Sequence, residues 1–407
     1  MRDAISPARY KSYRDVLEDI SGEKILARID INLPIGRDGS VMSFFKARKH
    51  LETTIKVFSE SALVLMSHQG RVGDDNFTLL EEHAMWFKRH LGDRFKYVSD
   101  IIGEKAIEMI EGLEPGEILL LENVRLLAEE TLDGNASKLS NTIFVKRLSP
   151  HFKYFILDAF GTLHRPHTSL IGFIHSLPSY IGPLVEEELG VLSDMIFSDD
   201  KCAYILGGAK PETKILVMRR ILEDNENSVF LLGGAIANIF LTLYGVVPKP
   251  VSRRMVSGLD QSVVRECREI IEEYGDRIYL PRDFRMVRDG ELVEKPVGRM
   301  SIGDEPQDIG GRTVEYYIDV LKGFDRVMVN GPLGIIENEL TRWGTYQILE
   351  FLARSGGIYR VAGGGHIVLA LENLGVIDNF DYVSTGGGSL LTLLSGKVPA
   401  PLSLLSR

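Results

Sequence analysis

Cysteine is scarce in this sequence of 407 residues, and the two that occur, Cys202 and Cys267, lie far apart without metal-ligand spacing. Their number and placement exclude a disulfide framework and give no indication of a zinc site. Long apolar stretches are also missing, since none approaches the roughly 18 to 20 residues that span a membrane. The first residues, MRDAISPARYKSYRD, lack the apolar core of a secretory signal. We therefore expect a cytoplasmic protein that does not enter a membrane.

Positive charge is in short supply, because 57 acidic residues outnumber 47 lysines and arginines and leave a formal net charge of −10. This balance argues against a nucleic-acid-binding protein, which usually needs a basic face to replace the counterions of the phosphates. Any basic site must therefore be local. Clusters of Arg, Lys and His become informative against such an acidic background.

The common nucleotide-binding signatures are absent as well. The chain has no G-x-x-x-x-G-K-[ST] loop, no H-R-D or D-F-G motif and no strand-linked G-x-G-x-x-G. These absences argue against a P-loop ATPase, a protein kinase and a dinucleotide dehydrogenase. A G-x-S-x-G elbow is missing too, and no residue stands out as a covalent nucleophile. A transferred group should therefore pass directly between its substrates.

The length predicts two domains, and 44% hydrophobic with 26% charged residues is the composition of a globular protein. Short apolar runs alternate with longer helical patterns, which is typical of an α/β protein with mainly parallel sheets. Residues 79–91 fit one helical face, and we expect His83 and His90 within it to face solvent. Buried strands are expected at residues 24–31, 62–67, 117–122 and 154–158.

Polar and basic residues follow each of these four strands. Because ligands of doubly wound sheets sit outside the carboxyl ends of the strands, we expect these side chains to converge on one rim. Several arginines and histidines there would suit a small phosphate or carboxylate ligand held by forked hydrogen bonds. In strand order, the residues are Asp30 and Asn32, then His68, Gly70 and Arg71, then Glu122, Asn123 and Arg125, and finally His164, Arg165 and His167.

The last of these groups lies in the stretch ILDAFGTLHRPHTSLIG at residues 156–172 and carries three cationic or near-cationic side chains within four positions. A packed core would not tolerate such donors unpaired, so the stretch indicates an anion site. A simpler interpretation is that Asp158 pairs with Arg165 while the two histidines lie on a solvated loop. The similar ends of the other strands favour the anion site.

The sequence changes character between residues 177 and 200, where prolines and a glycine precede a helical pattern at 185–197. We expect a hinge and a connecting helix here, followed by a second half that starts near Lys201. Apolar runs of that half end in glycine or turn residues, and glycine lets backbone amides approach a phosphate. Together the runs predict a polyphosphate site, with Lys210 and Lys214 as point charges. They lie at 201–210, 228–238, 277–283, 326–334, 358–366 and 381–389.

Eight stretches resemble the phosphoglycerate kinase family, in the family's order and along nearly the whole chain. HQGR, NFTLLEEHA and GGGH resemble its archaeal branch in particular. The resemblance implies two Rossmann-like doubly wound domains separated by a hinge and cleft. It also implies a reversible, glycolytic transfer of phosphate between ATP and 3-phosphoglycerate, giving ADP and 1,3-bisphosphoglycerate, with Mg²⁺ carried by the nucleotide. The stretches are RIDINLP (28–34), SHQGR (67–71), LLLENVR (119–125), DAFGTLHR (158–165), LGGAK (206–210), NGPLG (330–334), GGGH (363–366) and STGGG (384–388).

The same resemblance implies that different segments of the chain have different roles. We expect the protein to be a monomer or a homodimer. Residues 1–184 would bind 3-phosphoglycerate, 185–200 would form the connecting helix and hinge, 201–392 would bind ATP or ADP, and 393–407 would return to the first domain. The implied substrate residues are Asp30, Ile31, Asn32, His68, Gln69, Gly70, Arg71, Arg125 and Arg165. The implied nucleotide residues are Gly207, Gly208, Lys210, Lys214, Asn330, Glu337, Gly363, Gly364, Gly365 and His366, and Lys210, Gly365 and Gly388 would also serve the transfer itself.

The chain departs from the family pattern at a few positions. The family's catalytic arginine falls on Lys46, or on Arg48 if the loop has slipped by two residues, and lysine keeps the charge but loses the planar fork. Thr213 replaces an acidic residue, and His366 stands where other branches have aspartate. Water and phosphate oxygens would then supply most of the Mg²⁺ shell. An alternative hypothesis is a non-catalytic phosphoglycerate- or nucleotide-binding protein on the same fold.

Overall fold

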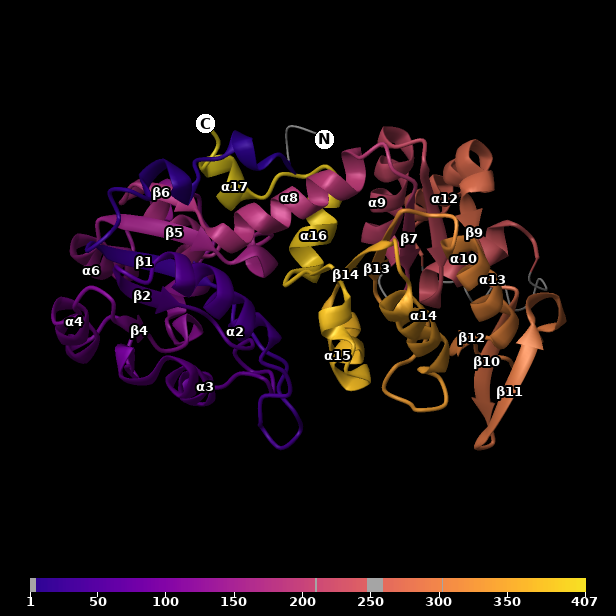
Figure 1. Ribbon diagram of the computed structural model, residues 1–407, viewed down its shortest axis with the longest axis horizontal. Helices are drawn as coiled ribbons and strands as arrows, with labels where there is room; N and C mark the ends of the chain where they lie inside the picture. Colours follow the sequence, from indigo (N-terminus) through magenta and orange to yellow (C-terminus); the bar gives the residue numbers. More distant parts are fainter. Residues whose placement is uncertain (1–4, 209–210, 247–258, 302) are drawn as a thin grey trace. The chain divides into compact units, whose positions relative to one another are not determined.

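The computed structural model describes residues 5–208, 211–246, 259–301 and 303–407. Its chain divides into two compact units (Figure 1). The first unit contains the chain up to Val191 together with Lys397–Arg407, and the second contains Leu192–Gly396. Among the described ranges, no helix combines the length and apolar character that crossing a membrane requires.

The first unit is built on a six-stranded sheet in which every neighbouring pair of strands is parallel. Its order is β3-β4-β2-β1-β5-β6, so β2, β3 and β4 lie on one side of β1 and β5 and β6 lie on the other. This reversal beside β1 creates a switch point, where ligands of doubly wound sheets bind. The strands are β1 (Lys24–Ile29), β2 (Ala62–Met66), β3 (Phe95–Tyr97), β4 (Ile118–Leu120), β5 (Tyr154–Asp158) and β6 (Ser179–Ile181).

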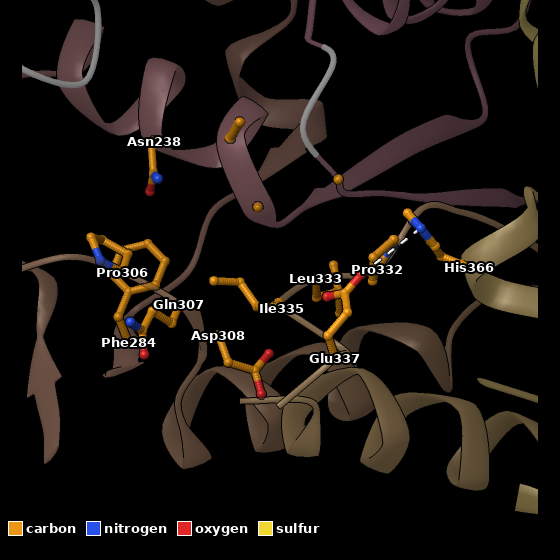
Figure 2. Close-up of a pocket in the computed structure, with 14 residues that line it drawn as sticks. Asn238, Phe284, Pro306, Gln307, Asp308, Pro332, Leu333, Ile335, Glu337 and His366 are labelled. Atoms are coloured by element: carbon orange, nitrogen blue, oxygen red, sulfur yellow. Dashed lines mark ion pairs between the residues drawn. The ribbon is translucent and has the colours of Figure 1, made fainter. Parts of the chain in front are cut away.

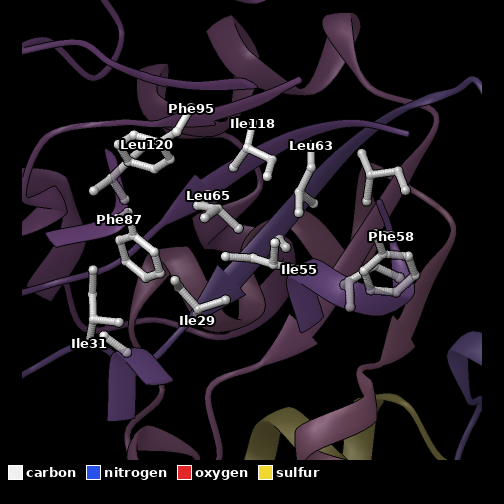
Figure 3. Packing of buried hydrophobic residues seen from close by; sticks show 14 of the residues in the cluster. Ile29, Ile31, Ile55, Phe58, Leu63, Leu65, Phe87, Phe95, Ile118 and Leu120 are labelled. Atoms are coloured by element: carbon white, nitrogen blue, oxygen red, sulfur yellow. The ribbon is translucent and has the colours of Figure 1, made fainter. Parts of the chain in front are cut away.

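Helices cover this sheet because each presents an apolar side to it. Figure 3 shows Ile29, Leu65 and Ile118 from the strands packed near Phe87 of α3 and Ile55, all of them buried. Burial of such side chains contributes roughly 1.5–3 kcal/mol each, which fixes the sheet beneath its rim. The helices are α2 (Phe45–His50), α3 (Glu81–Leu91), α4 (Glu104–Glu111), α5 (Ala136–Leu139), α6 (Ile143–Leu148) and α7 (Thr168–Ile171), and a π turn, η3 (Leu51–Ile55), continues α2.

The second unit repeats the same architecture. Its main sheet has the order β15-β14-β13-β7-β8-β9, again parallel throughout, with the reversal beside β7. The strands are β7 (Cys202–Leu206), β8 (Ser228–Leu232), β9 (Ile278–Tyr279), β13 (Arg326–Asn330), β14 (Tyr359–Gly363) and β15 (Tyr382–Val383). The helices are α9 (Pro211–Asp224), α10 (Gly234–Leu243), α12 (Gln261–Tyr274), α13 (Gly311–Leu321), α14 (Trp343–Arg354), α15 (Gly365–Leu374) and α16 (Gly387–Leu394). The expected α/β class with two doubly wound parallel sheets is confirmed.

A small antiparallel sheet in the second unit was not expected from the sequence. It consists of β11 (Glu291–Pro296), β10 (Asp283–Arg288) and β12 (Asp308–Ile309), in that order. Asp289 and Gly290, both with positive φ, form the turn between β10 and β11. A DG pair is a strong hairpin signal, so the sequence contained the information for this hairpin.

The connecting helix α8 (Pro183–Phe197) begins two residues before the predicted start and runs past the boundary between Val191 and Leu192. Asp158 at the end of β5 accepts a hydrogen bond from the backbone N–H of Val185 at 2.9 Å, which satisfies one of the free donors of the first helical turn. The final helix α17 (Ala400–Leu404) belongs to the first unit, where Lys11 N–H donates to the carbonyl of Leu405 at 2.9 Å.

Candidate active site

Basic side chains from several strand ends gather on the rim of the first sheet. Arg71 follows β2, Arg125 lies in the 3-10 turn after β4, and Arg165 follows β5. Burial, followed by repulsion from Arg165 and Arg28, lowers the pKa of Arg125 to about 10. Burial and then repulsion from Arg71 also lower the pKa of Arg165. The neighbouring guanidinium groups create a positive electrostatic potential, and a bound anion would offset their mutual repulsion.

Asp30 and Lys46 form an ion pair at the carboxyl end of β1. Lys46 Nζ on α2 lies 2.7 Å from Oδ2 of Asp30, and the backbone N–H of Asn32 donates to Oδ1 at 3.1 Å. Burial works to raise the pKa of Asp30, but the charge and hydrogen bond of Lys46 lower it overall. Asp30 is therefore ionised, and Lys46 Nζ is held at the rim.

Asn32 and Gly70 join the ends of β1 and β2. Asn32 Oδ1 accepts from the backbone N–H of Gly70 at 2.9 Å, and Gly70 has φ 65°. Alanine at Gly70 would place its Cβ 2.2 Å from the carbonyl oxygen of Asn76, so the turn requires glycine. Ile31 contributes its backbone N–H to Ser67 Oγ at 3.0 Å, while its side chain lies in the core.

The Gln69 side chain has four hydrogen bonds within the protein. Oε1 accepts from the N–H of Leu33 at 2.8 Å and from His83 Nε2 at 3.1 Å. Nε2 donates to the carbonyls of Leu33 and Asn76. A carboxamide can make no more strong bonds than these, so this side chain braces the loop. The expectation that His83 faces solvent is wrong, because His83 is 1% exposed and bonded to Gln69, whereas His90 is exposed as expected.

The two histidines beside Arg165 do not add two cations to the rim. Arg165 Nε donates to His164 Nε2 at 3.1 Å, and burial together with Arg165 lowers the pKa of His164 to about 4. His167 Nδ1 instead lies 3.6 Å from Oε1 of the buried Glu130. This stretch therefore supplies the guanidinium group of Arg165 to the rim, while His164 is bonded to it and His167 contacts Glu130.

The simpler interpretation, an ion pair between Asp158 and Arg165, is wrong. The carboxylate of Asp158 accepts from Thr54 Oγ1 and from the N–H of Val185 at the start of α8. Burial raises the pKa of Asp158 to about 7. Asp158 is thus a structural cap that leaves Arg165 available to a ligand.

Two residues of this site were missed by the sequence analysis. Arg28, the next-to-last residue of β1, is fully buried and contacts His68 Nδ1 through Nη2 at 2.9 Å. His68 in turn has a buried Nε2 without a hydrogen-bond partner. Glu130, also fully buried, receives two hydrogen bonds from Ser169. A charged residue inside the apolar run KILARIDI was the available signal for Arg28, because buried charges need partners.

The second unit contains a cavity of about 310 Å³ at the carboxyl ends of β7, β8 and β13 (Figure 2). Glu337 and His366 lie at one end of it, where Oε1 and Nε2 are 3.9 Å apart, and both side chains are exposed. Asn238 and Phe284 lie toward the other end. Backbone of Gly208 and of the first turn of α10 lines the cavity between these ends. The walls are therefore largely apolar and peptide-lined, with the carboxyl groups of Asp308 and, at one end, of Glu337.

Close backbone contacts position the glycine loop after β7. Gly208 N–H donates to the carbonyl of Pro332 at 2.6 Å, and Gly207 N–H donates to that of Asn330 at 3.2 Å. A Cβ on Gly207 would lie only 2.0 Å from the carbonyl oxygen of Pro332. Glycine is needed here for close approach of two main chains. The expected transfer residue Lys210 lies outside the described residues, so its contacts stay a prediction.

Lys214 is engaged by the protein instead of projecting into the cavity. Its buried Nζ donates to the carbonyls of Gly207 and Asn330, and burial lowers its pKa to about 8. Asn330 Nδ2, by contrast, is buried without a partner, beside Gly363 and Gly364. Both side chains were expected to serve the nucleotide, but Lys214 Nζ is already bonded to carbonyl groups, and only Asn330 has an open donor.

The two later glycine loops lie against each other at the starts of α15 and α16. A Cβ on Gly387 would lie 3.1 Å from Cα of Gly364, which has φ 97°. Gly365 and Gly388 belong to the first turns of these helices. Amides in first helical turns lack internal acceptors and carry the positive end of the helix dipole. Such amides can stabilise developing negative charge without any ionisable side chain.

A rim of cations on one doubly wound unit, and glycine loops and helix starts at the strand ends of the other, are means by which enzymes hold phosphate groups. Fold and site together define a two-domain kinase. Residues 14–397 match the profile described as phosphoglycerate kinase. The chain belongs to the phosphoglycerate kinase family.

Individual relatives agree with this assignment. Phosphoglycerate kinase of Archaeoglobus fulgidus is 37% identical over 96% of this chain and 95% of the relative. That of Methanopyrus kandleri is 37% identical over 94% of each chain. The crystal structure of phosphoglycerate kinase from Pyrococcus horikoshii OT3 has 32% identity and a TM-score of 0.86, covering 97% of this chain and 98% of that one. The expected resemblance to the archaeal branch is confirmed.

Proposed function

We propose that this chain reversibly transfers a phosphoryl group between ATP and the carboxylate of 3-phosphoglycerate, with the acid bound by the first unit and the nucleotide by the second. The observation that carries the proposal is the convergence of Arg71, Arg125 and Arg165. Each guanidinium group is near enough to another to lower a pKa, and none forms an ion pair within the described residues. A ligand with two separate negative groups would supply the missing countercharge.

The polar ends of the acid have different partners in this proposal. Arg71, Arg125 and Arg165 bind the 3-phosphate with His68, because guanidinium forks match phosphate oxygens. Buried donors without partners at His68 Nε2 and Arg125 Nε support this role, since an unmade buried hydrogen bond costs about 1–3 kcal/mol. Asp30 and Asn32 orient the hydroxyl and carboxylate end, with Gly70 and Gln69 holding the loop around it.

Lys46 is the proposed catalytic cation of α2. Its Nζ is held 2.7 Å from Asp30, at the end of the rim assigned to the reacting carboxylate. An ammonium there offsets the repulsion between the carboxylate and the incoming phosphoryl group. In a loose phosphoryl-transfer transition state, such placement of charge carries most of the catalysis. Arg48, two positions along the same helix, remains the alternative.

The nucleotide occupies the cavity of the second unit in this scheme, with its ribose hydroxyls on Glu337. Gly207, Gly208 and Asn330 border the phosphates, with His366 and the loop at 363–366 nearby. Lys210 bridges the moving group, and Lys214 keeps the glycine loop in place. The amides of Gly365 and Gly388 receive charge that develops on the phosphoryl oxygens.

Magnesium would arrive on the nucleotide. Within the described residues, no three His, Cys, Asp or Glu side chains are grouped to hold a metal ion, and Thr213 is exposed. These residues fit an ion held mainly by phosphate oxygens and water, which is how Mg²⁺ commonly binds at nucleotide sites. When bound, it neutralises charge on the phosphates. The protein's own groups then orient the two substrates.

Transfer requires the reacting oxygens to approach within roughly 3 to 3.5 Å. Because the acid and the nucleotide belong to different units, we propose closure about the connecting segment at residues 185–200. Closure also removes water, which would otherwise compete for the phosphoryl group. The final segment, residues 393–407, provides the second covalent link between the units.

The test is a coupled assay with ATP, Mg²⁺ and 3-phosphoglycerate, run in both directions. We expect turnover in the range of about 1–100 s⁻¹ that typifies kinases. Binding of both ligands without turnover would instead establish the non-catalytic alternative. Calorimetry with each ligand alone provides the matched measurement of binding.

A further inference from the structure

Arg28 is a fully buried cation one residue before the carboxyl end of β1, close to the cationic rim. Its Nε donates to Ser169 Oγ at 2.8 Å, Nη1 donates to the carbonyl of Ile29, and Nη2 contacts Nδ1 of His68 at 2.9 Å. All three nitrogens therefore have partners. The guanidinium group is held within the protein and can affect a ligand only through the residues that it contacts.

The contact with His68 fixes where the imidazole proton lies. A guanidinium group has only donors, so Nδ1 of His68 must be the acceptor. A neutral imidazole with an accepting Nδ1 carries its proton on Nε2. This assignment follows from the chemistry of the two groups and not from the placement of hydrogens.

A buried carboxylate keeps Arg28 in this orientation. Ser169 Oγ, which accepts from Arg28, donates to Glu130 Oε1 at 2.7 Å, and the N–H of Ser169 donates to Oε2 at 2.8 Å. Glu130 and Arg28 are both 0% exposed. A buried cation is tolerated when an opposite charge and hydrogen bonds compensate it. Glu130 supplies the opposite charge, and Ser169 links it to Arg28 by hydrogen bonds.

The other face of the imidazole is open. His68 is 1% exposed, and its Nε2 has no hydrogen-bond partner. Burial, followed by repulsion from Arg28, Arg125, Arg165 and Lys46, holds the pKa of His68 well below its ordinary value. His68 is therefore a neutral donor among cations, which needs an acceptor oxygen to complete its hydrogen bonding.

We propose that Arg28 is a positioning residue that, supported by Ser169 and Glu130, fixes the Nε2–H tautomer of His68 so that this N–H donates to an anionic oxygen of the acid substrate. The contact to the substrate rests on the function proposed above, whereas the tautomer rests on the buried contacts alone. His68 then serves as a hydrogen-bond donor of constant protonation instead of a titrating cation.

The first test is the tautomer in the unmodified protein. Long-range ¹H–¹⁵N spectra of ¹⁵N-histidine-labelled protein distinguish the two nitrogens of each ring, and His68→Gln identifies the signal among nine histidines. We expect His68 to carry its proton on Nε2 and to keep it there throughout pH 5.5 to 8.5. A proton on Nδ1, or protonation within that range, would overturn the proposal without any variant of Arg28.

The second test separates positioning from mere stability. In Arg28→Met, kcat/KM for 3-phosphoglycerate should fall about 10- to 100-fold, the loss of one hydrogen bond to a charged oxygen. In a His68→Ala background, Arg28→Met should lower kcat/KM less than about twofold, because the imidazole through which Arg28 acts is absent. Equal losses in both backgrounds would mean that Arg28 does not act through His68.

Control variants guard against loss of folding. Arg147→Met removes an exposed arginine of α6 and should leave kcat/KM unchanged. If Arg28→Met does not fold, Ser169→Ala takes its place, since it removes the acceptor of Arg28 Nε and leaves the guanidinium group in place. It should broaden or shift the His68 signal and lower kcat/KM; an unaltered signal and rate would count against the arrangement. An Nε2–H tautomer in a protein that does not bind 3-phosphoglycerate would refute the proposed function while leaving the positioning intact.

Discussion

The two units share an architecture, a six-stranded parallel sheet whose strand order reverses beside its first strand, yet they present different chemistry at their strand ends. The rim of the first unit consists of side chains such as Lys46, Arg125 and His68, each held by a hydrogen bond to the protein or left with an open donor. The rim of the second consists mostly of peptide groups at Gly208, Gly365 and neighbouring positions. One fold therefore supports two ways of holding an anion.

The difference matches the ligands that we propose. A small acid with negative groups at both ends needs separate charges in set positions, which side chains with fixed tautomers and ion pairs provide. A polyphosphate lies along several loops, where successive amides and helix dipoles act together. Truncating a side chain should therefore damage the first rim, whereas adding a Cβ should damage the second.

The largest expected effect is that of Gly207→Ala. The new Cβ would lie 2.0 Å from the carbonyl oxygen of Pro332, so the loop after β7 has to move. We expect KM and Kd for ATP to rise at least about 100-fold while the affinity for 3-phosphoglycerate is unchanged, because a misplacement of about 1 Å can cost that much. Gly356→Ala, where no heavy atom lies within 4 Å, is the control. Unchanged ATP affinity in Gly207→Ala would show that this loop does not hold the nucleotide.

Lys46→Ala tests the first rim. Turnover should fall about 100- to 1,000-fold, the range for removal of one electrostatic transition-state contact, with a smaller change in the KM for 3-phosphoglycerate. Thermal unfolding of the variant measures the separate cost of leaving Asp30 without its partner. Arg48→Ala is the matched variant on the same helix. A larger loss of turnover in Arg48→Ala would transfer the catalytic role to Arg48.

The Asp158→Asn variant tests how the buried carboxyl group of Asp158 affects the pH dependence of the free energy of unfolding. Its pKa is raised from 3.8 to about 7, so the folded state binds more protons between these values and the free energy of unfolding falls as pH rises. At about 1.4 kcal/mol per unit, and less near each of the two pKa values, the wild type should lose about 3 kcal/mol relative to Asp158→Asn between pH 4 and pH 7. Urea unfolding at several pH values measures this difference.

Asp308 offers the counterpart in the second unit. It accepts from the N–H of Gly344 at 2.6 Å near the start of α14, and burial raises its pKa to about 7. Asp308→Asn should therefore show the same dependence as Asp158→Asn, in the unfolding of its own unit. A flat difference between variant and wild type across pH 4–7 in either unit would mean that the carboxyl group there is ionised when buried.

The smallest effect is expected for Glu337→Gln. The side chain is 68% exposed, so its hydrogen bonds to the ribose compete with water and should contribute only about 0.5–1 kcal/mol. We expect a two- to fivefold rise in KM for ATP, with turnover unchanged. Glu339→Gln, 82% exposed on the same loop, is the control. A tenfold or greater loss in Glu337→Gln would show that the second rim depends on a side chain after all.

Local patterns in the sequence determined the α/β class, most strand positions and the glycine loops, since burial and turn chemistry act between near neighbours. The motifs also identified the candidate residues of both rims. Only the tertiary structure decided that Lys46 pairs with Asp30, that His83 is bonded to Gln69, and that carbonyl groups accept hydrogen bonds from Lys214.

The tautomer of His68 depends on contacts between residues that are farther apart in the sequence. Arg28 is 40 positions from His68 and 141 from Ser169. Residues so far apart meet only when β1 lies between β2 and β5, and this order of strands is a property of the folded sheet. Which nitrogen carries the imidazole proton is therefore decided by tertiary contacts, because a partner's donors act only at hydrogen-bond distance.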